Sequence, residues 1–210
     1  VQGDADLFIS VPVKTLSSTP QISRVIFSTL LTAYYEFNTN PLHRTLFLID
    51  EMPRLGYMAE LETARDVGAG YGIVLWVIVQ DMGQLEKAYG EPGVRGWMES
   101  CYLKNFFGIS ELKTAEMLSN MLGKSTIRYT TRSGSTSGGI KAVLGGGNTD
   151  SQSDQYKERS LLDPAELMRL TSDENGVPDE QIVFIRNQYP IRCGMAKWYR
   201  RAEWEDLKSS

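Results

Sequence analysis

The 210-residue chain has little histidine and cysteine and no long apolar run. Its single histidine and its two cysteines, Cys101 and Cys193, are too few and too widely separated for a metal site or a disulfide framework. We expect both thiols to be reduced and half-buried, as is usual in a cytosolic compartment. No apolar stretch approaches the length of a transmembrane helix and no signal peptide opens the chain, so we expect any membrane anchor to lie outside this sequence.

A strong excess of charge of one sign is also absent. The 22 basic and 26 acidic residues give a formal net charge of -4, which argues against a surface that coats DNA indiscriminately. A basic lining of a central channel would still be compatible with this balance. With 41% apolar residues, the chain is long enough for one α/β core, so the sequence predicts a single structural domain over residues 1–210.

The glycine-rich phosphate loop GxxxxGK[ST], known as Walker A, is missing from the sequence. The one Gly-Lys pair, Gly123-Lys124, follows Met121-Leu122 and has no glycine-rich stretch before it. The run of three glycines at 145–147 has no strand before it and no Lys-Ser/Thr after it. Neither segment is therefore predicted to cradle a phosphate with backbone N–H groups.

Residues 45–56, TLFLIDEMPRLG, carry the strongest functional signal that is present. An apolar run too short for a helix leads to two adjacent carboxylates, Asp50 and Glu51, and then to a turn with a proline. The run reads as a strand buried on both faces, as in parallel sheets. This is the pattern of a Walker B strand, in which the first acid holds Mg²⁺, usually through water, and the second orients or deprotonates the attacking water.

A second polar strand end follows 30 residues later. Residues 57–67 have helical spacing, residues 68–72 are a glycine-rich loop, and the apolar run 73–79 ends at Gln80-Asp81. A β-α-β unit of this kind brings both strand ends to the carboxyl edge of a parallel sheet, where α/β proteins bind ligands. A simple strand cap is the usual role of such a glutamine, but next to Asp50 and Glu51 it becomes a candidate sensor of a γ-phosphate or the lytic water.

The rest of the chain continues the alternation of helix and strand. A strand is expected over 7–11, and a helix begins at Thr19-Pro20 and runs to Phe37. Ser110 is the expected N-cap of a later helix, and the last two strands should pair antiparallel. Further helices are expected over 82–89, 94–100, 112–122 and 163–170, and strands over 102–109, 182–186 and 193–199. With no hairpin signal in mid-chain, the sequence predicts an α/β fold of three layers, doubly wound around a mostly parallel sheet with an antiparallel edge near the C-terminus.

Residues 132–154 are rich in glycine and serine and are expected to form a flexible loop, because they cannot bury enough surface to offset the entropy of ordering. A mobile loop that touches phosphates through Arg128, Arg132 and Lys141 is the functional alternative. The most basic segment lies near the C-terminus. A solvated edge strand explains its charges adequately, and contact with nucleotide or a neighbouring subunit is the alternative. Its basic residues are Arg186, Arg192, Lys197, Arg200 and Arg201.

The chain from about residue 6 to about residue 199 resembles a known family, the TraG and TraD group of type IV secretion coupling proteins, over the second half of their motor domain. The resemblance is carried, in the family's order, by IDEMPRLG, GAGYGIVLWVIVQDMGQLEKAYG, NFFGISELKTAEMLSNMLGKSTI, RSLLDPAELMRL and IVFIRNQYPIRCGMAKWY. It implies part of a RecA-like P-loop NTPase core whose Walker A half lies upstream. It also implies a hexameric ATPase anchored at the cytoplasmic face of the bacterial inner membrane.

The resemblance further implies a role for each candidate residue. Asp50 and Glu51 correspond to the Walker B pair, with Asp50 near Mg²⁺, and Gln80 to the sensor glutamine; all three would contact ATP or its Mg²⁺. Many members carry a basic residue before the sensor strand as an arginine finger. Here that finger is Arg65, comes from elsewhere, or is absent. The implied partners are further copies of the chain, a relaxase-DNA complex or secreted effector proteins, single- or double-stranded DNA, and the components of the secretion channel.

Two other functions stay open at this point. One is a DNA translocase or helicase outside secretion, which would share the RecA-like core. The other is a non-catalytic docking module that recognises relaxosome or effector partners. Since Walker A is absent, we expect the 210-residue chain by itself to be folded but catalytically silent, and the complete protein to be an ATPase.

Overall fold

The computed structural model describes residues 6–37, 44–134 and 150–204. The chain divides into two compact units, and the assignment of residues 1–210 to one domain stays a prediction. Unit 1 comprises residues 1–104 and 184–189, and unit 2 comprises residues 105–183 and 190–210. The described strands lie in three separate sheets, of order β1-β2, β3-β6-β7 and β4-β5, rather than in one continuous sheet. Unit 1 holds one parallel β-α-β unit, and unit 2 is built mainly on antiparallel pairs.

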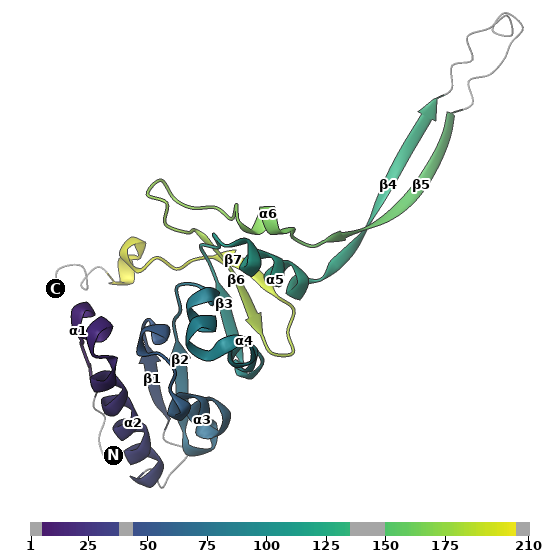
Figure 1. Cartoon of the computed structure of the whole chain (residues 1–210). Helices are drawn as coiled ribbons and strands as arrows, with labels where there is room; N and C mark the ends of the chain where they lie inside the picture. The colour runs from purple at the N-terminus through teal and green to yellow at the C-terminus, as the bar shows by residue number, and fades with distance from the viewer. Residues whose placement is uncertain (1–5, 38–43, 135–149, 205–210) are drawn as a thin grey trace, which may run out of the picture. The chain divides into compact units, whose positions relative to one another are not determined.

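The elements follow one another along the chain as Figure 1 shows. In unit 1 they are α1 (Val13–Ser18), α2 (Pro20–Phe37), β1 (Thr45–Ile49), the 3-10 helix η1 (Met52–Leu55), α3 (Ala59–Val67), the 3-10 helix η2 (Gly68–Tyr71), β2 (Ile73–Val77) and α4 (Met82–Ser100). They continue with β3 (Leu103–Phe106), α5 (Leu112–Leu122), β4 (Lys124–Gly134), β5 (Asp150–Ser160), α6 (Pro164–Leu167), β6 (Glu180–Ile185), β7 (Ile191–Gly194) and the 3-10 helix η4 (Trp198–Arg200).

The β-α-β unit of unit 1 is the predicted one. β1 and β2 pair in parallel, with Thr45 opposite Ile73 and Ile49 opposite Val77. The connecting α3 packs on β2, and its inward residues Leu61 and Ala64 are buried. Together with buried residues of α2, η1 and α4 they form one apolar cluster, which fixes the two strand ends relative to the helices.

One face of the β1-β2 pair is exposed, so the expectation of a strand buried on both faces is wrong for the described residues. Leu46 and Leu48 of β1 are 52% and 56% exposed, and Trp76 of β2 is 59% exposed. Leu48 and Trp76 are paired in register, so these side chains share one face of the pleat. Both faces of β1 and β2 carry apolar residues, which is typical of a sheet covered on both sides. The described helices of the unit cover only one of these faces.

The N-terminal segment also differs from expectation. No strand forms over the predicted residues 7–11, and Leu7 and Phe8 are 70% and 90% exposed. A β-prone run needs a neighbouring strand to pair with, and none of the described strands lies beside this one. A short helix, α1, follows instead. The next helix, α2, begins at the predicted Pro20 and buries Leu31 and Tyr34.

Helix α4 covers both short helices predicted over 82–89 and 94–100, but the predicted turn between them is reduced to a break at Gly90, and residues 91–93 are helical. Its backbone breaks at Gly90, which has φ 70° and ψ 169°, conformations that glycine adopts without strain. Asp81 caps its first turn by accepting a hydrogen bond from the Gln84 N–H at 2.7 Å. Both halves contribute to the core of unit 1 through Leu85, Tyr89 and Trp97.

Unit 2 contains the predicted helix α5, which ends before Gly123, but its N-cap is Glu111 and not Ser110. Helix α6 begins at Pro164 with a full capping box between Asp163 and Glu166, and it ends at Leu167, one turn earlier than predicted. β6 and β7 pair antiparallel, as predicted. The last strand was expected to run over 193–199 and instead ends at Gly194.

The β4–β5 hairpin corrects two predictions. Its strands pair antiparallel from Lys124 opposite Ser160 to Gly134 opposite Asp150, so a mid-chain hairpin does exist. Residues 132–134 and 150–154, both ends of the expected loop, belong to its strands; residues 135–149, with Lys141, lie outside the described residues. The β-branched and aromatic run 126–131 was the signal for this strand. Among the described residues, no helix combines the length and apolarity needed to cross a membrane.

Candidate functional site

The ends of β1 and β2 meet at one edge of unit 1. The Ile78 N–H donates to the Ile49 carbonyl, and the Met52 N–H donates to the Ile78 carbonyl, each at 3.0 Å. These two hydrogen bonds continue the parallel ladder beyond the strands. The residues that follow, Asp50 and Glu51 on one chain segment and Gln80 on the other, therefore leave the sheet at the same edge. The predicted geometry is confirmed; the chemical roles of the three residues stay predictions.

Glu51 has an unusual backbone conformation for a residue with a side chain. Its φ of 56° and ψ of 46° lie in the left-handed region, which carries an energetic cost outside glycine, asparagine and aspartate. The surrounding turn holds it there. The Arg54 N–H donates to the Glu51 carbonyl at 3.0 Å, and the Arg54 guanidinium also forms an ion pair with the Glu51 carboxylate through Nε and Oε2.

The turn after the two acids is locked to the core. Met52 and Leu55 of η1 are buried, and Arg24 of α2 donates from its Nε to the Leu55 carbonyl. Gly56 closes the turn at φ 70°, and a Cβ at this position would lie 2.4 Å from Arg24 Nη2. The glycine at the end of PRLG therefore does two things. It adopts the positive φ of the turn, and it leaves space for the Arg24 guanidinium.

Asp50 and Gln80 are both exposed at the edge. The Gln80 Oε1 accepts a hydrogen bond from Gln84 Nε2 at 3.1 Å, which links the predicted sensor to the first turn of α4. Within the described residues there is no group of three or more His, Cys, Asp and Glu side chains that could hold a metal. Mg²⁺ in nucleotide sites is held by one or two carboxylates together with water and substrate phosphates, so a single exposed carboxylate such as Asp50 fits that role.

Arg65, the candidate arginine finger, is held inside its own unit. Its guanidinium is only 12% exposed, donates from Nε to Asp66 at 2.7 Å and from Nη1 to Glu62 at 3.3 Å, and stacks over the Trp97 ring at 5.1 Å. The hydrogen bond from Arg65 lowers the pKa of Asp66. These contacts join α3 to the second half of α4. They favour a structural role for Arg65, so the arginine finger comes from elsewhere or is absent.

A chain of aromatic rings supports the same region. Tyr57 and Tyr89 lie 5.5 Å apart between ring centroids, and Tyr89 and Trp97 lie 5.8 Å apart, all edge to face. Burial raises the pKa of Tyr89 to about 12, so its phenol stays neutral throughout the physiological range. The hydrogen bond to Glu62 is the main reason that the pKa of Tyr57 is also raised.

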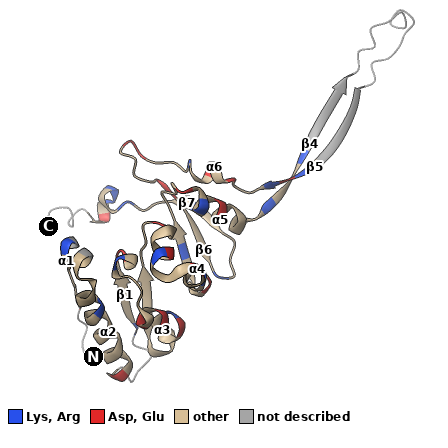
Figure 2. Ribbon diagram, viewed as in Figure 1, with Lys and Arg blue, Asp and Glu red and all other residues tan. Residues whose placement is uncertain are grey.

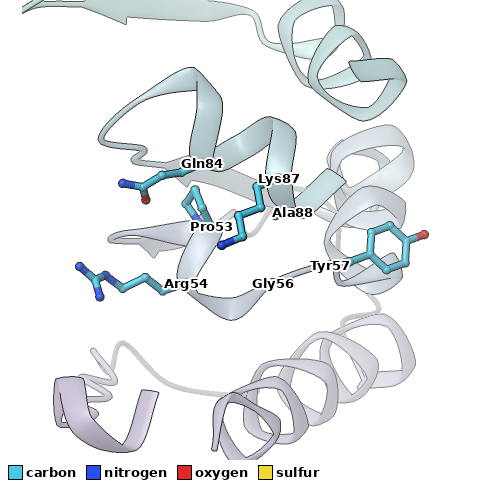
Figure 3. Close-up of a pocket in the computed structure, with 7 residues that line it drawn as sticks. All are labelled: Pro53, Arg54, Gly56, Tyr57, Gln84, Lys87 and Ala88. Atoms are coloured by element: carbon cyan, nitrogen blue, oxygen red, sulfur yellow. The ribbon is translucent and has the colours of Figure 1, made fainter. Parts of the chain in front are cut away.

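A hollow of about 460 Å³ lies next to the candidate edge (Figure 3). Sequence reasoning missed three of its residues, Arg54, Gln84 and Lys87. The spacing held a signal for two of them, because Arg54 is three residues after Glu51 and Gln84 is four residues after Gln80, at the starts of η1 and α4. The hollow is lined by Pro53, Arg54, Gly56, Tyr57, Gln84, Lys87 and Ala88.

The Gly123-Lys124 pair, by contrast, lies in unit 2. Gly123 follows the C-terminus of α5 at φ 84°, and Lys124 opens β4, where it forms an ion pair with Glu158 at 3.6 Å. A phosphate loop connects a strand to the N-terminus of a helix, so this helix-to-strand junction has the opposite order. The structure agrees with the expectation that Gly123-Lys124 is not a phosphate loop.

A parallel β-α-β unit with two acids and a glutamine at its carboxyl edge is typical of the P-loop NTPase class. The solved structures agree with that fold. The bacterial conjugative coupling protein TrwBdeltaN70 in its unbound form matches with a TM-score of 0.68 at 19% identity, over 90% of this chain and 40% of that one. TrwB in complex with ADP and Mg2+ matches with a TM-score of 0.66 at 18% identity, over 90% and 39%. The fold is thus α/β and RecA-like, with parallel and antiparallel sheets.

The family described as Type IV secretory system Conjugative DNA transfer matches residues 2–210, and the chain belongs to this family. The conjugal transfer protein TraG of Agrobacterium fabrum is 40% identical over 208 residues, which are 99% of this chain and 29% of TraG. The type IV secretion system-coupling protein VirD4 of Bartonella henselae is 38% identical over 201 residues, 96% of this chain and 30% of VirD4. The chain thus spans less than a third of the length of these relatives.

Proposed function

We propose that this chain is part of an ATP-driven coupling protein that delivers relaxase-bound DNA or effector proteins to a type IV secretion channel. The observation that carries the proposal is the shared edge of β1 and β2, where two hydrogen bonds hold Asp50 and Glu51 beside the strand that leads to Gln80. Membership of the conjugative DNA transfer family supports the secretion assignment over other RecA-like motors. The proposal includes a hexamer at the cytoplasmic face of the inner membrane.

Each residue of the edge has a proposed role. Asp50 holds Mg²⁺ through water, and the ion, when bound, supplies positive charge beside the phosphates of ATP. Glu51 orients and polarises the attacking water. Arg54 occupies Oε2 of Glu51, which leaves Oε1 to accept a hydrogen bond from that water. The Gln80 amide reports the γ-phosphate to α4 through its hydrogen bond with Gln84.

Charge stabilisation by a phosphate loop is absent from the sequence, so we propose that the 210 residues by themselves do not hydrolyse ATP. The complete protein brings this loop from another part of its chain.

The roles are tested by substitution in the complete protein. Glu51→Gln should retain nucleotide binding and reduce hydrolysis by roughly two to four orders of magnitude, because an amide fits the site but cannot accept the proton. Asp50→Ala should instead weaken the Mg²⁺-dependent part of nucleotide binding. Glu60→Gln, on the exposed first turn of α3, is the matched control and should leave both quantities unchanged. Equal turnover by wild type and Glu51→Gln would remove Glu51 from the chemistry.

A further inference from the structure

The hollow beside the candidate edge has two walls, both within unit 1. One is the turn η1 with the residues after it, and the other is the first half of α4. In Figure 3 the side chains of Arg54 and Gln84 extend toward the same side from these two walls, while the Tyr57 ring lies at the opposite end. The hollow is open to solvent along its length, so a small ligand can enter and leave it without movement of the backbone.

The lining is positively charged. Arg54 and Lys87 are both exposed, and no carboxylate is among the lining residues. Within the described parts of the chain, the Lys87 ammonium forms no ion pair, whereas Arg54 pairs with Glu51. Arg54 uses Nε for Glu51 and carries further N–H donors on its two Nη atoms. Lysine as a point charge and arginine as a fork are the side chains that proteins use for phosphate groups.

Two lining residues touch the predicted catalytic residues directly. Arg54 contacts the Glu51 carboxylate, and Gln84 contacts the Gln80 amide. A phosphate that leaves the edge between Glu51 and Gln80 thus meets hydrogen-bond donors of the hollow on both sides. Arg54 lies next to Glu51, and Gln84 lies next to Gln80. Lys87 follows Gln84 by three residues on the same face of α4. It adds a second positive charge to that of Arg54.

We propose that this hollow is a release site for inorganic phosphate, which Arg54 and Lys87 hold after hydrolysis and before it reaches solvent. The inference rests on the proposed function, since hydrolysis of the terminal anhydride of ATP by water gives ADP and the phosphate that enters the hollow. No bond is made or broken in the hollow itself. Arg54 exchanges part of its hydrogen bonding from Glu51 to the phosphate, so occupancy of the hollow also signals to Glu51 that product is present.

The first test needs no hydrolysis and uses the 210-residue chain. Inorganic phosphate is titrated against the ¹⁵N-labelled chain, and the shifts of the Lys87 and Gly56 amide resonances are followed. Saturable shifts are expected, and Lys87→Gln should weaken the affinity about tenfold, the size of one charge-assisted hydrogen bond. Arg95→Gln is the matched control, because Arg95 is an exposed cation on the same helix, outside the hollow, whose only described ion pair is a loose one of 3.7 Å to Glu91.

Several outcomes of this titration overturn the proposal. One is the absence of saturable shifts at the hollow. Another is equal weakening by Lys87→Gln and Arg95→Gln, which would indicate general electrostatic attraction. A single-stranded oligonucleotide, titrated in a second arm, should not displace the phosphate. Displacement by the oligonucleotide with the same dependence on Lys87 would assign the hollow to the DNA backbone instead.

The second test uses the complete protein and separates this inference from the proposed function. Added inorganic phosphate should inhibit steady-state ATP hydrolysis, and Lys87→Gln should raise the half-inhibitory phosphate concentration about tenfold while Arg95→Gln leaves it unchanged. Unchanged inhibition in Lys87→Gln overturns the release site even if ATP is hydrolysed. A complete protein that lacks ATPase activity, with phosphate still bound by the 210-residue chain, would instead contradict the proposed function.

Discussion

Two aspartates, one in each unit, lie in opposite surroundings. In unit 2, Asp173 is 5% exposed, and its Oδ2 receives hydrogen bonds from Lys197 at 2.8 Å and from Arg200 at 2.9 Å. In unit 1, Asp50 is exposed at the end of β1 and forms no ion pair with any described residue. Both acids lie close to strands. The difference is that Asp173 is paired with two cations of its own unit, while Asp50 is exposed to solvent.

Several basic residues of unit 2 form ion pairs within the unit. Lys197 bonds Asp173 and Asp179, and Arg192 pairs with Glu180 through both its Nε and its Nη2 at 2.9 Å. The hydrogen bond from Lys197 lowers the pKa of Asp173. Burial works against the charged Lys197 ammonium, but its hydrogen bonds with the two aspartates outweigh burial and raise its pKa. Both signs of charge occur in each unit (Figure 2).

The comparison separates a carboxylate that is paired within the fold from one that is exposed to solvent. A carboxylate that is saturated by the protein has no free lone pairs for Mg²⁺ or water, and it contributes to the folded state instead. Glu51 lies between these cases. Arg54 pairs with one of its oxygens, Oε2, and its backbone is held in the left-handed region.

The largest expected effect tests the internal network. Lys197→Met should strongly lower the melting temperature, because it removes the buried cation that bonds Asp173 and Asp179 and leaves them only the half-exposed Arg200 as a described ion-pair partner. Lys87→Met, which removes an exposed lysine without an ion-pair partner among the described residues, should change it little. The measurement is thermal unfolding by circular dichroism. Similar melting temperatures for the two variants would show that the two units do not differ in this way.

The turn beside Glu51 offers the next effect. Gly56→Ala should destabilise the fold by about 1–3 kcal/mol, because alanine at a φ of 70° is strained and its Cβ would meet the Arg24 guanidinium. Gly70→Ala in η2 is the matched control, since a Cβ there meets nothing within 4 Å. Urea unfolding of both variants gives the comparison. Equal stability of Gly56→Ala and Gly70→Ala would mean that the Arg24 side chain can move away from the added Cβ without a loss of stability.

Acid unfolding sharpens the comparison further. The paired Arg192 guanidinium, with help from Thr171, lowers the pKa of Glu180 from 4.5 to about 2. Because the folded protein releases this proton more readily than the unfolded chain, Glu180 contributes stability above pH 4.5, and this contribution is lost as the pH falls toward about 2. Glu180→Gln should therefore be less stable than wild type at pH 7 and differ least near pH 2. A constant difference between the two over this range would show that the pairing does not lower the pKa.

The smallest expected effect concerns the open edge. MgATP should raise the melting temperature of the 210-residue chain very little, because a ligand stabilises as RT ln(1 + [L]/Kd) and the phosphate loop is missing. The same experiment on Asp50→Ala gives the background. A large shift in the wild-type chain that disappears in Asp50→Ala would show that this edge binds nucleotide without Walker A.

Local signals predicted much of this molecule. Pro20 fixed the start of α2, Gly123 fixed the end of α5, and Asp163 with Glu166 marked the capped start of α6. The apolar runs before Asp50 and Gln80 predicted β1, β2 and their parallel pairing. These features depend on residues close in sequence, where propensity, capping and periodicity are strong.

Long-range pairing was predicted less well. The strand over 7–11 did not form, since no described strand pairs with it, and the hairpin strands around the glycine- and serine-rich segment were missed because composition was given more weight than the β-prone run before it. The last strand ends at Gly194, and Lys197, three residues later, pairs with two aspartates. No local pattern around Lys197 signals that partnership.

The sequence by itself determined the acidic pair, the glutamine after the next strand and the β-α-β order that brings them to one edge, because a short right-handed crossover allows few other arrangements. Only the tertiary structure decided that Arg54 holds Glu51, that Arg65 is buried against Trp97, and that Lys87 faces a hollow beside the edge. These contacts join side chains whose directions depend on how η1, α3 and α4 pack, and packing is settled by the whole core rather than by any one segment.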